Sequence, residues 1–147
     1  MKLLRIAVQM DPIEKVIVNH DTSLALMVEA QARGHELWWF SPNDLYYETG
    51  TVKARARRVS VSFEEGAHYK TLEEAARAVD DFDVVLVRQD PPFDMAYVTN
   101  TYLLELTKTL VINPPRGIRN ISEKMSILQF PELTPKTWVG RDLDALQ

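Results

Sequence analysis

A charged seven-residue loop, Arg88-Gln-Asp-Pro-Pro-Phe-Asp94, follows directly on the apolar segment VVLV at 84–87. One arginine and two aspartates surround two adjacent prolines, and none of these residues suits the continuation of a buried strand. The prolines restrict the backbone, so the charged side chains are held outward at little further entropic cost. A rigid loop with both signs of charge suits a ligand that carries an ammonium and a carboxylate.

The two ends of this loop have different competing explanations. An aspartate ahead of an apolar helical pattern is typical of a helix N-cap, and capping is the favoured role of Asp94. An arginine at the end of an apolar strand needs a carboxylate partner or a ligand, and Asp83 lies too far back along the strand to reach Arg88 easily. We therefore expect Arg88 to bind a ligand.

Two further polar loops follow apolar segments of the chain. Asp11 comes after the segment 3–9 and precedes a proline, while Asn113 ends the segment 110–113 ahead of two prolines. Turn formation is the default role of Asp11, with magnesium binding or general-base action as alternatives. In an open parallel sheet, ligands bind at the edge where the carboxyl ends of the strands meet. We predict that Arg88, Asp11 and Asn113 surround one hollow at that edge.

The elements that must position these loops follow from hydrophobic periodicity and from capping residues. Strands are expected at 3–9, 36–40, 83–87 and 110–113, helices at 21–34, 71–79 and 94–108, and a hairpin at 45–63 that turns at Thr49-Gly50. The helix at 71–79 depends on a start that resembles a capping box, T-x-x-E. This alternation predicts an α/β fold with a central parallel sheet and an added β-hairpin.

The pattern changes after Pro115. A short helical piece is expected within 116–130 and a strand-like piece at 137–139. The last seven residues, RDLDALQ, begin a helical pattern at Asp142 without a C-terminal stop signal. We expect the chain to end inside a longer protein.

Composition restricts the class of protein. Of 147 residues, 46% are apolar and 26% are charged, which suits one folded domain rather than a disordered chain. The net charge of -4 gives no general attraction to nucleic acid or to an anionic membrane. No apolar run is long enough to cross a bilayer, and there is no cysteine for a disulfide or a thiolate metal site. A cytoplasmic protein with a small-molecule partner is expected.

Other motifs are weaker. A receiver-type phosphorylation domain would have a pair of acids after its first strand, whereas Asp11 stands alone before proline. The basic stripe KARARR at 53–58 could bind phosphate, but a solvated hairpin face is the commoner role, and we assign it no function. Neither G-x-G-x-x-G nor a P-loop motif occurs, and the three histidines show no metal-ligand spacing. By spacing alone, Lys124 would be a surface residue.

Six stretches together resemble the N-terminal part of bacterial glutathione synthetase. In chain order they are QMDPIEKV, DTSLALMVEAQARGHEL, DVVLVRQDPPFDMAY, TYLLE, LVINPPRGIRNISEK and FPELTP. The resemblance runs from Met1 to about Arg141 and is loose at 46–80. Gln89 stands where some relatives carry lysine.

The resemblance implies a Rossmann-like pre-ATP-grasp domain that binds substrate at 1–120, followed at 121–147 by the start of an incomplete ATP-grasp region. The family's enzyme is an ATP-dependent carboxylate-amine ligase that uses magnesium or manganese. It joins γ-glutamylcysteine to glycine through an acyl phosphate and forms glutathione. The resemblance also implies a homo-oligomer for the longer enzyme.

Site residues carry over by position. Arg88 would pair with a substrate carboxylate, Asp11, Asp90 and Asn113 would line the same cleft, and Lys124 would contact the ATP phosphates. Catalytic residues and metal ligands would lie outside this chain, which we expect to be inactive alone. Two alternatives are a stand-alone Rossmann-like binding module and the N-terminal domain of another ATP-grasp ligase.

Overall fold

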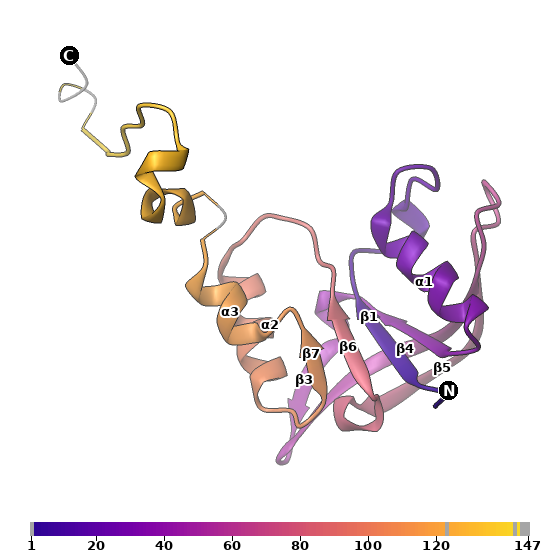
Figure 1. Ribbon diagram of the computed structural model, residues 1–147. Helices are drawn as coiled ribbons and strands as arrows, with labels where there is room; N and C mark the ends of the chain where they lie inside the picture. The colour runs from indigo at the N-terminus through magenta and orange to yellow at the C-terminus, as the bar shows by residue number, and fades with distance from the viewer. Residues whose placement is uncertain (1, 123, 143, 145–147) are drawn as a thin grey trace.

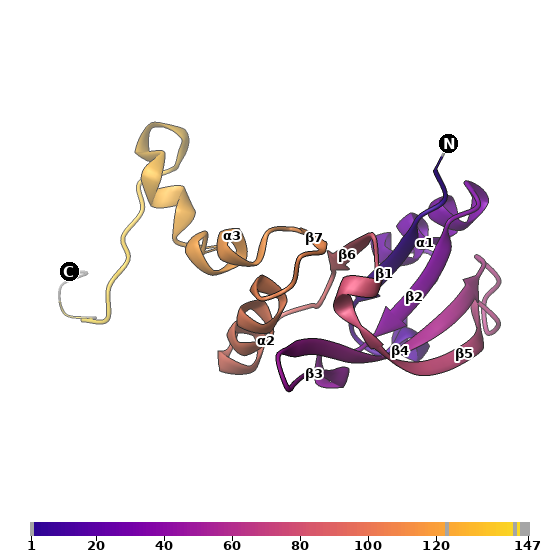
Figure 2. The same cartoon turned by 90° about the horizontal axis from the view of Figure 1, so that it is seen from below.

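The structure is a computed structural model that describes residues 2–122, 124–142 and 144. Its strands are β1 (Arg5–Gln9), β2 (Glu36–Phe40), β3 (Leu45–Glu48), β4 (Thr51–Val61), β5 (Tyr69–Ala78), β6 (Val84–Val87) and β7 (Leu110–Ile112). Its α-helices are α1 (Thr22–Ala32), α2 (Met95–Glu105) and α3 (Pro115–Asn120). Short 3-10 turns are η1 (Ile13–Lys15), η2 (Pro42–Asp44), η3 (Val79–Asp81), η4 (Ser126–Gln129) and η5 (Pro131–Leu133). Figures 1 and 2 show the residues after α3 projecting away from the sheet.

Four strands form the parallel part of the sheet. β1 lies between β2 and β6, and β7 pairs with the outer side of β6, all in parallel register. β1, β2 and β6 are nearly continuous apolar runs, as expected of strands that are buried on both faces, whereas Leu110 and Ile112 of the edge strand β7 are exposed. The prediction of four parallel strands is confirmed.

Two apolar layers pack on opposite faces of these strands. On one face, Ala7 and Val85 pack in a buried cluster with Leu104 of α2. On the other face, Ile6 and Val8 pack in a second cluster with Leu24 and Met27 of α1. The alternation of side chains along each strand therefore directs the two helices to different faces.

Helix α1 begins and ends where the capping residues predict. The Asp21 Oδ1 atom accepts a hydrogen bond of 2.8 Å from the backbone N–H of Leu24, and Gly34 takes a positive φ of 84° just after the helix. A carboxylate at the N-cap and a left-handed glycine at the C-terminus satisfy backbone groups that the helix leaves free. The Asp94 side chain caps α2 in the same way, with a bond of 2.9 Å from Tyr97 N–H.

The predicted hairpin is confirmed as β3 and β4. Both turn residues have positive φ, 44° at Thr49 and 88° at Gly50, as a type I′ turn requires. One edge of β4 pairs with β3 and β2, while its other edge pairs with β5 in antiparallel register. We call the two long strands β4 and β5 the ribbon.

The predicted helix at 71–79 is wrong, because this segment forms β5. Its residues pair with residues 53–61 of β4, including Arg57 with Glu74 and Arg58 with Glu73. Both pairs are ion pairs, with N–O distances of 3.1 Å and 3.3 Å. An isolated helix of nine residues is marginal, and pairing with β4 outweighs the local helix preference.

The pairing also corrects the interpretation of the basic stripe. Arg57 and Arg58 are partly buried and bind acids of β5, so they do not form a fully solvated face. The register shifts between Arg58 and Val59, where Leu72 is an extra residue in β5. This extra residue makes a β-bulge in the strand.

The segment after α3 lacks the predicted strand-like piece at 137–139. Residues 134–142 form no helix or strand, because no neighbouring strand lies beside them to share hydrogen bonds. The expected final helix falls largely on residues 143 and 145–147, which lie outside the described residues. The domain boundary near residue 120 stays a prediction. Within the described part of the chain, none of the helices has the length and apolar character needed to span a bilayer.

Candidate functional site

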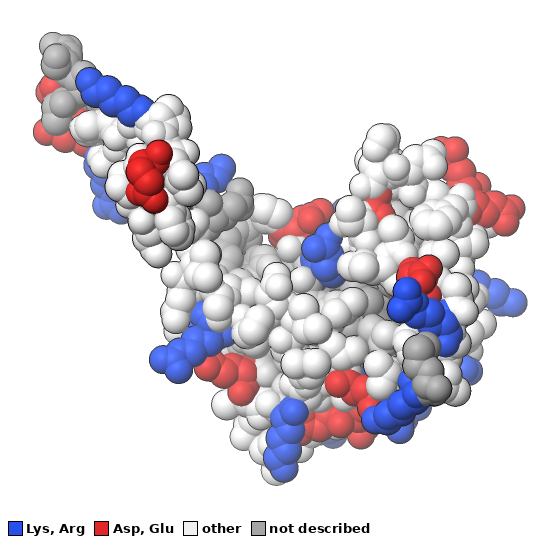
Figure 3. Space-filling model, viewed as in Figure 1, with Lys and Arg blue, Asp and Glu red and all other residues white. Residues whose placement is uncertain are grey.

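The site is built on three neighbouring strands that end at the same edge of the sheet. β1, β6 and β7 are adjacent and parallel, so the residues that follow Gln9, Val87 and Ile112 come out together. The backbone N–H of Arg88 donates to the carbonyl of Gln9 at 2.7 Å and continues the parallel pairing into the loop. On the face seen in Figure 3, a basic and an acidic patch lie side by side at this edge, between α1 and the C-terminal segment.

Arg88 reaches from the end of β6 to the first turn of α1. Its Nε atom donates to Ser23 Oγ at 3.1 Å and its Nη2 atom donates to Thr22 Oγ1 at 2.5 Å. Among the residues that the structure describes, no carboxylate forms a salt bridge with Arg88. Asp83, at the other end of β6, binds Lys2 at 2.8 Å, and this hydrogen bond lowers the pKa of Asp83. Two hydroxyls hold the Arg88 guanidinium in place without neutralising its charge.

Asp11 and Asp90 lie beside Arg88. The Asp11 Oδ2 atom accepts a hydrogen bond of 2.8 Å from the backbone N–H of Asp90, which joins the loop after β1 to the loop after β6. Asp11, Arg88 and Asp90 line one hollow of about 310 Å³ together with Lys15 of η1. We call this the Arg88 hollow. The structure therefore brings together three of the predicted residues.

Asn113 and Lys124 line a second hollow, of about 940 Å³, next to the first. Its walls are largely apolar and include Phe93 and Tyr97, whose ring centroids are 5.1 Å apart, together with Ile118. We call this the Asn113 hollow. The expectation of one shared hollow is thus modified, because the polar residues divide between two hollows at one edge of the sheet.

Gln89 and Tyr97 lie where the two hollows approach each other. Gln89 lines the Asn113 hollow, although its chain neighbours Arg88 and Asp90 line the Arg88 hollow. The Tyr97 hydroxyl donates to the Gln89 carbonyl at 3.5 Å. Burial raises the pKa of Tyr97; Arg88 opposes this shift, and the charge of Asp11 adds to it. The phenol of Tyr97 therefore lies within the electrostatic influence of the Arg88 hollow.

Sequence reasoning missed several residues of the site. Lys15 has no motif that marks it, and only the position of η1 brings it to the Arg88 hollow. The hydroxyls of Thr22 and Ser23 follow the N-cap Asp21, so the start of a helix near a strand end was the available signal. Among the described residues, no group of three or more acidic or histidine side chains is arranged to hold a metal ion.

An open α/β sheet with two hollows at the carboxyl ends of its parallel strands defines a Rossmann-like domain. Residues 4–119 match the family model described as prokaryotic glutathione synthetase, N-terminal domain. The chain belongs to this family.

Curated relatives agree with this assignment. The chain is 44% identical to a glutathione synthetase of Bradyrhizobium diazoefficiens over 145 residues, which cover 97% of this chain and 46% of the relative. It is 46% identical to the glutathione synthetases of Brucella melitensis, over 95% of this chain and 45% of the relative, and of Rhodopseudomonas palustris, over 97% and 46%. The chain thus spans less than half the length of these relatives, which are ligases by name.

Proposed function

We propose that this chain is the substrate-binding part of a glutathione synthetase of the ATP-grasp class, an ATP-dependent ligase that joins γ-glutamylcysteine to glycine. Arg88 carries this proposal. Its guanidinium is fixed by Ser23 and Thr22, yet no carboxylate among the described residues neutralises it. A preorganised cation that keeps free donors at a ligand edge is suited to bind a substrate carboxylate.

The charges around the Arg88 hollow match the head of a γ-glutamyl group. That head carries an ammonium and a carboxylate on the same carbon atom. Arg88 and Lys15 supply two cations for the carboxylate, and Asp90 and Asp11 supply acceptors for the ammonium. Asp11 also holds the Asp90 backbone, which fixes the spacing of the two acids. Charge-assisted pairs of both signs select a zwitterion over a simple anion.

The Asn113 hollow continues from this point toward Lys124. Neighbouring strands lie roughly 4.8 Å apart, so β1 and β7 are separated by about 10 Å, comparable with an extended dipeptide. The apolar wall formed by Phe93 and Tyr97 suits the thiol side chain, since sulfur packs favourably against aromatic rings.

The described residues include a group suited to bind ATP but no set of ligands for a metal ion. Lys124 lines the Asn113 hollow, and an exposed ammonium there suits an ATP phosphate, the group that ATP would supply for transfer. The described residues contain no ligand set for magnesium or manganese, so we assign the metal no ligand in this chain. A cytoplasmic location and a homo-oligomeric longer enzyme, both implied by the family, belong to the same proposal.

A titration of the chain with γ-glutamylcysteine, followed by ¹H–¹⁵N NMR including the arginine Nε–H signals, tests the proposal. We expect shifts centred on Arg88, Asp90 and Asp11, with weak affinity because less than half of the relatives' length is present. The α-linked isomer is the matched control, because its free carboxylate and ammonium are on different carbon atoms. Equal shifts with both isomers, or shifts only at distant residues, would contradict the proposal.

A further inference from the structure

The turn η1 forms one wall of the Arg88 hollow. Pro12, Lys15 and Val16 line the hollow, and Lys15 is the second cation in it. The turn has two backbone hydrogen bonds of its own, from Lys15 to Pro12 at 2.9 Å and from Val16 to Ile13 at 3.3 Å. A single 3-10 turn of three residues is not stable alone, so contacts with other elements must fix its position.

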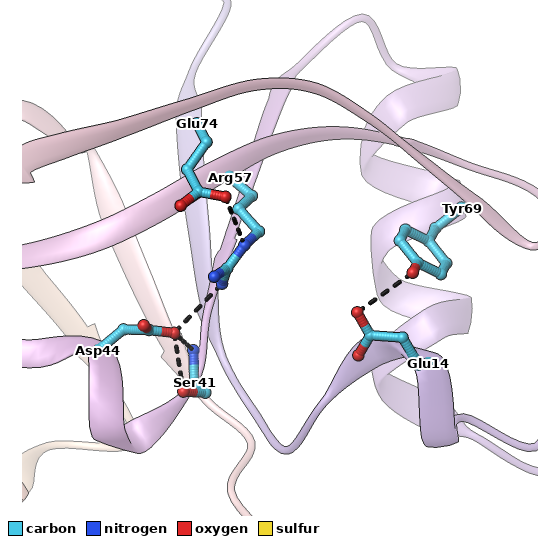
Figure 4. Close-up of polar contacts among 6 residues, drawn as sticks. All are labelled: Glu14, Ser41, Asp44, Arg57, Tyr69 and Glu74. Carbon is cyan, nitrogen blue, oxygen red and sulfur yellow. Dashed lines mark hydrogen bonds and ion pairs between the residues drawn. The ribbon is translucent and has the colours of Figure 1, made fainter.

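Those contacts come from His68, which directly precedes β5, and from Tyr69, the first residue of that strand. The His68 Nε2 atom lies 2.7 Å from the Ile13 carbonyl, to which it donates, and the His68 side chain is buried. The next residue, Tyr69, donates its hydroxyl hydrogen to Glu14 Oε1 at 3.1 Å (Figure 4). His68 and Tyr69 therefore hold two consecutive residues of η1, 55 positions away in the sequence.

The contact with Ile13 is the stronger of the two. The Ile13 side chain is fully buried, and its carbonyl accepts both the Val16 N–H and the His68 Nε2–H. A buried carbonyl that loses a hydrogen bond costs more than an exposed pair that separates. Tyr69 and Glu14 are exposed to solvent to a greater degree, so their bond contributes less.

The molecule offers an internal comparison for this arrangement. The turn η2 follows β2 as η1 follows β1, and the ribbon also holds it, through Arg57 Nη1 and Asp44 Oδ2 at 3.2 Å (Figure 4). Unlike η1, η2 contributes no residue to either hollow. Loss of the ribbon's contact with η2 should therefore destabilise the fold without changing a ligand site.

We propose that His68, with Tyr69 beside it, is a positioning residue that fixes η1 so that Lys15 stands with Arg88 at the carboxylate side of the hollow. This inference rests on the proposed function for its ligand, but its geometric content is independent of it. His68 touches no reacting group and acts through the Ile13 carbonyl. The ribbon is thereby linked to substrate recognition although it lies outside the Arg88 hollow.

Three variants of the chain test this role. His68→Phe removes the donor but keeps an aromatic ring beside Tyr69, whereas His68→Gln retains an N–H donor of similar reach. Arg57→Gln is the control, because it loses the contact with η2 instead. For each variant we would measure the melting temperature, the dissociation constant for γ-glutamylcysteine, and amide hydrogen exchange at Lys15 and Val16.

We expect His68→Phe to raise the dissociation constant about tenfold, the size of one lost hydrogen bond. His68→Gln should return it to within about twofold of the original value, and Arg57→Gln should lower the melting temperature with the dissociation constant unchanged. Equal affinity in His68→Phe and the unmodified chain, or no rescue by glutamine, would overturn the role of His68.

A failure of the proposed function would be seen separately, as no binding of γ-glutamylcysteine by any of the proteins. Hydrogen exchange then decides the positioning role by itself. Faster exchange at Lys15 and Val16 in His68→Phe than in Arg57→Gln would support it, and equal exchange in the two variants would overturn it.

Discussion

Two arginines, Arg57 in the ribbon and Arg88 at the ligand edge, have opposite surroundings. Arg57 binds Asp44 and Glu74 and its guanidinium lies over the Trp39 ring, 4.8 Å from the centroid. Figure 4 shows this side chain between its two acids. The Arg88 side chain, in contrast, binds the hydroxyls of Ser23 and Thr22 on α1 and no carboxylate of the described residues.

The difference separates a structural charge from a charge that is available to a ligand. The two carboxylates neutralise Arg57 and use its donors, so a ligand would have to break existing ion pairs to bind it. The hydroxyls that hold Arg88 restrict its rotamer but leave its charge and its Nη1 donors unused among the described residues. Orientation without neutralisation is what a carboxylate site needs, since the entropy of ordering the side chain is already lost in the free protein.

The largest expected effect comes from Arg88→Met. We expect the affinity for γ-glutamylcysteine to fall about 100-fold, or about 2.8 kcal/mol, because charge-assisted hydrogen bonds are lost. The free energy of unfolding should change by less than about 0.5 kcal/mol, because Arg88 is exposed. Isothermal titration and urea unfolding measure the two quantities. The affinity of Arg88→Lys, which keeps the charge without the planar fork, should lie between that of the unmodified chain and that of Arg88→Met. If Arg88→Met lost as much stability as Arg57→Gln, the two arginines would not differ in the way described.

Arg57→Gln should have the reverse profile. The substitution leaves Asp44 and Glu74 without their cation and uncovers Trp39, so the free energy of unfolding should fall by about 2 kcal/mol. Urea denaturation measures this loss. Arg55→Gln, an exposed position two residues earlier on β4, is the matched control and should change stability by less than about 0.5 kcal/mol. Equal losses in the two variants would show that the Arg57 ion pairs do not stabilise the fold.

A pH-dependent effect of medium size is expected at Asp44. Burial raises the pKa of its carboxyl, but hydrogen bonds from Ser41 and Arg57 outweigh burial and leave the pKa below its ordinary value of 3.8. A group whose pKa is lower in the folded state contributes stability above its unfolded pKa, and this contribution is lost as the pH falls through the folded value. Asp44→Asn should therefore be about 1 kcal/mol less stable than the original chain at pH 7, and this gap should close below about pH 4. Urea unfolding from pH 7 to pH 3 measures this difference in stability. A difference that does not change with pH would contradict the role of the ionised Asp44 carboxylate.

The smallest expected effect tests whether residues 71–78 form a strand, as in β5, or the helix that their sequence pattern predicts. Ala76 is exposed on β5 opposite Arg55, so Ala76→Thr should stabilise the chain by about 0.4 kcal/mol, since threonine favours strands. If this segment were the helix that its sequence pattern predicts, the same change would destabilise it by a similar amount. Ala96→Thr, at an exposed position in α2, is the control that should lose stability. The change in melting temperature of each variant shows whether the substitution stabilises or destabilises the chain.

Much of the fold could be predicted because the four parallel strands carry their own signals. The runs at 84–87 and 110–112 are apolar and end at charged or proline-rich loops, and both are strands in the structure. Capping aspartates marked α1 and α2 correctly. Local chemistry determined these elements, so the sequence was sufficient.

The ribbon could not be predicted in the same way. The segment TLEEAARAV has helix-forming residues and a helix-like start, and its strand form depends on the pairing of Glu73 and Glu74 with Arg58 and Arg57. A matching block of arginines on the preceding strand was the available signal. At the site, the ends of parallel strands were sufficient to place Asp11 and Arg88 in one hollow, whereas Asn113 lines the other. The division into two hollows depends on how α3 and the residues after it lie, which no local pattern encodes.

The extra residue Leu72 has a consequence for the outer edge of the sheet. β5 is ten residues long, and its far side presents backbone donors and acceptors that another extended chain could match. At Leu72 the regular spacing of those groups is interrupted, so an incoming chain would fall out of step after a few residues. Among the described strands, β5 has the longest such edge, and the bulge disfavours its pairing with the edge of another chain.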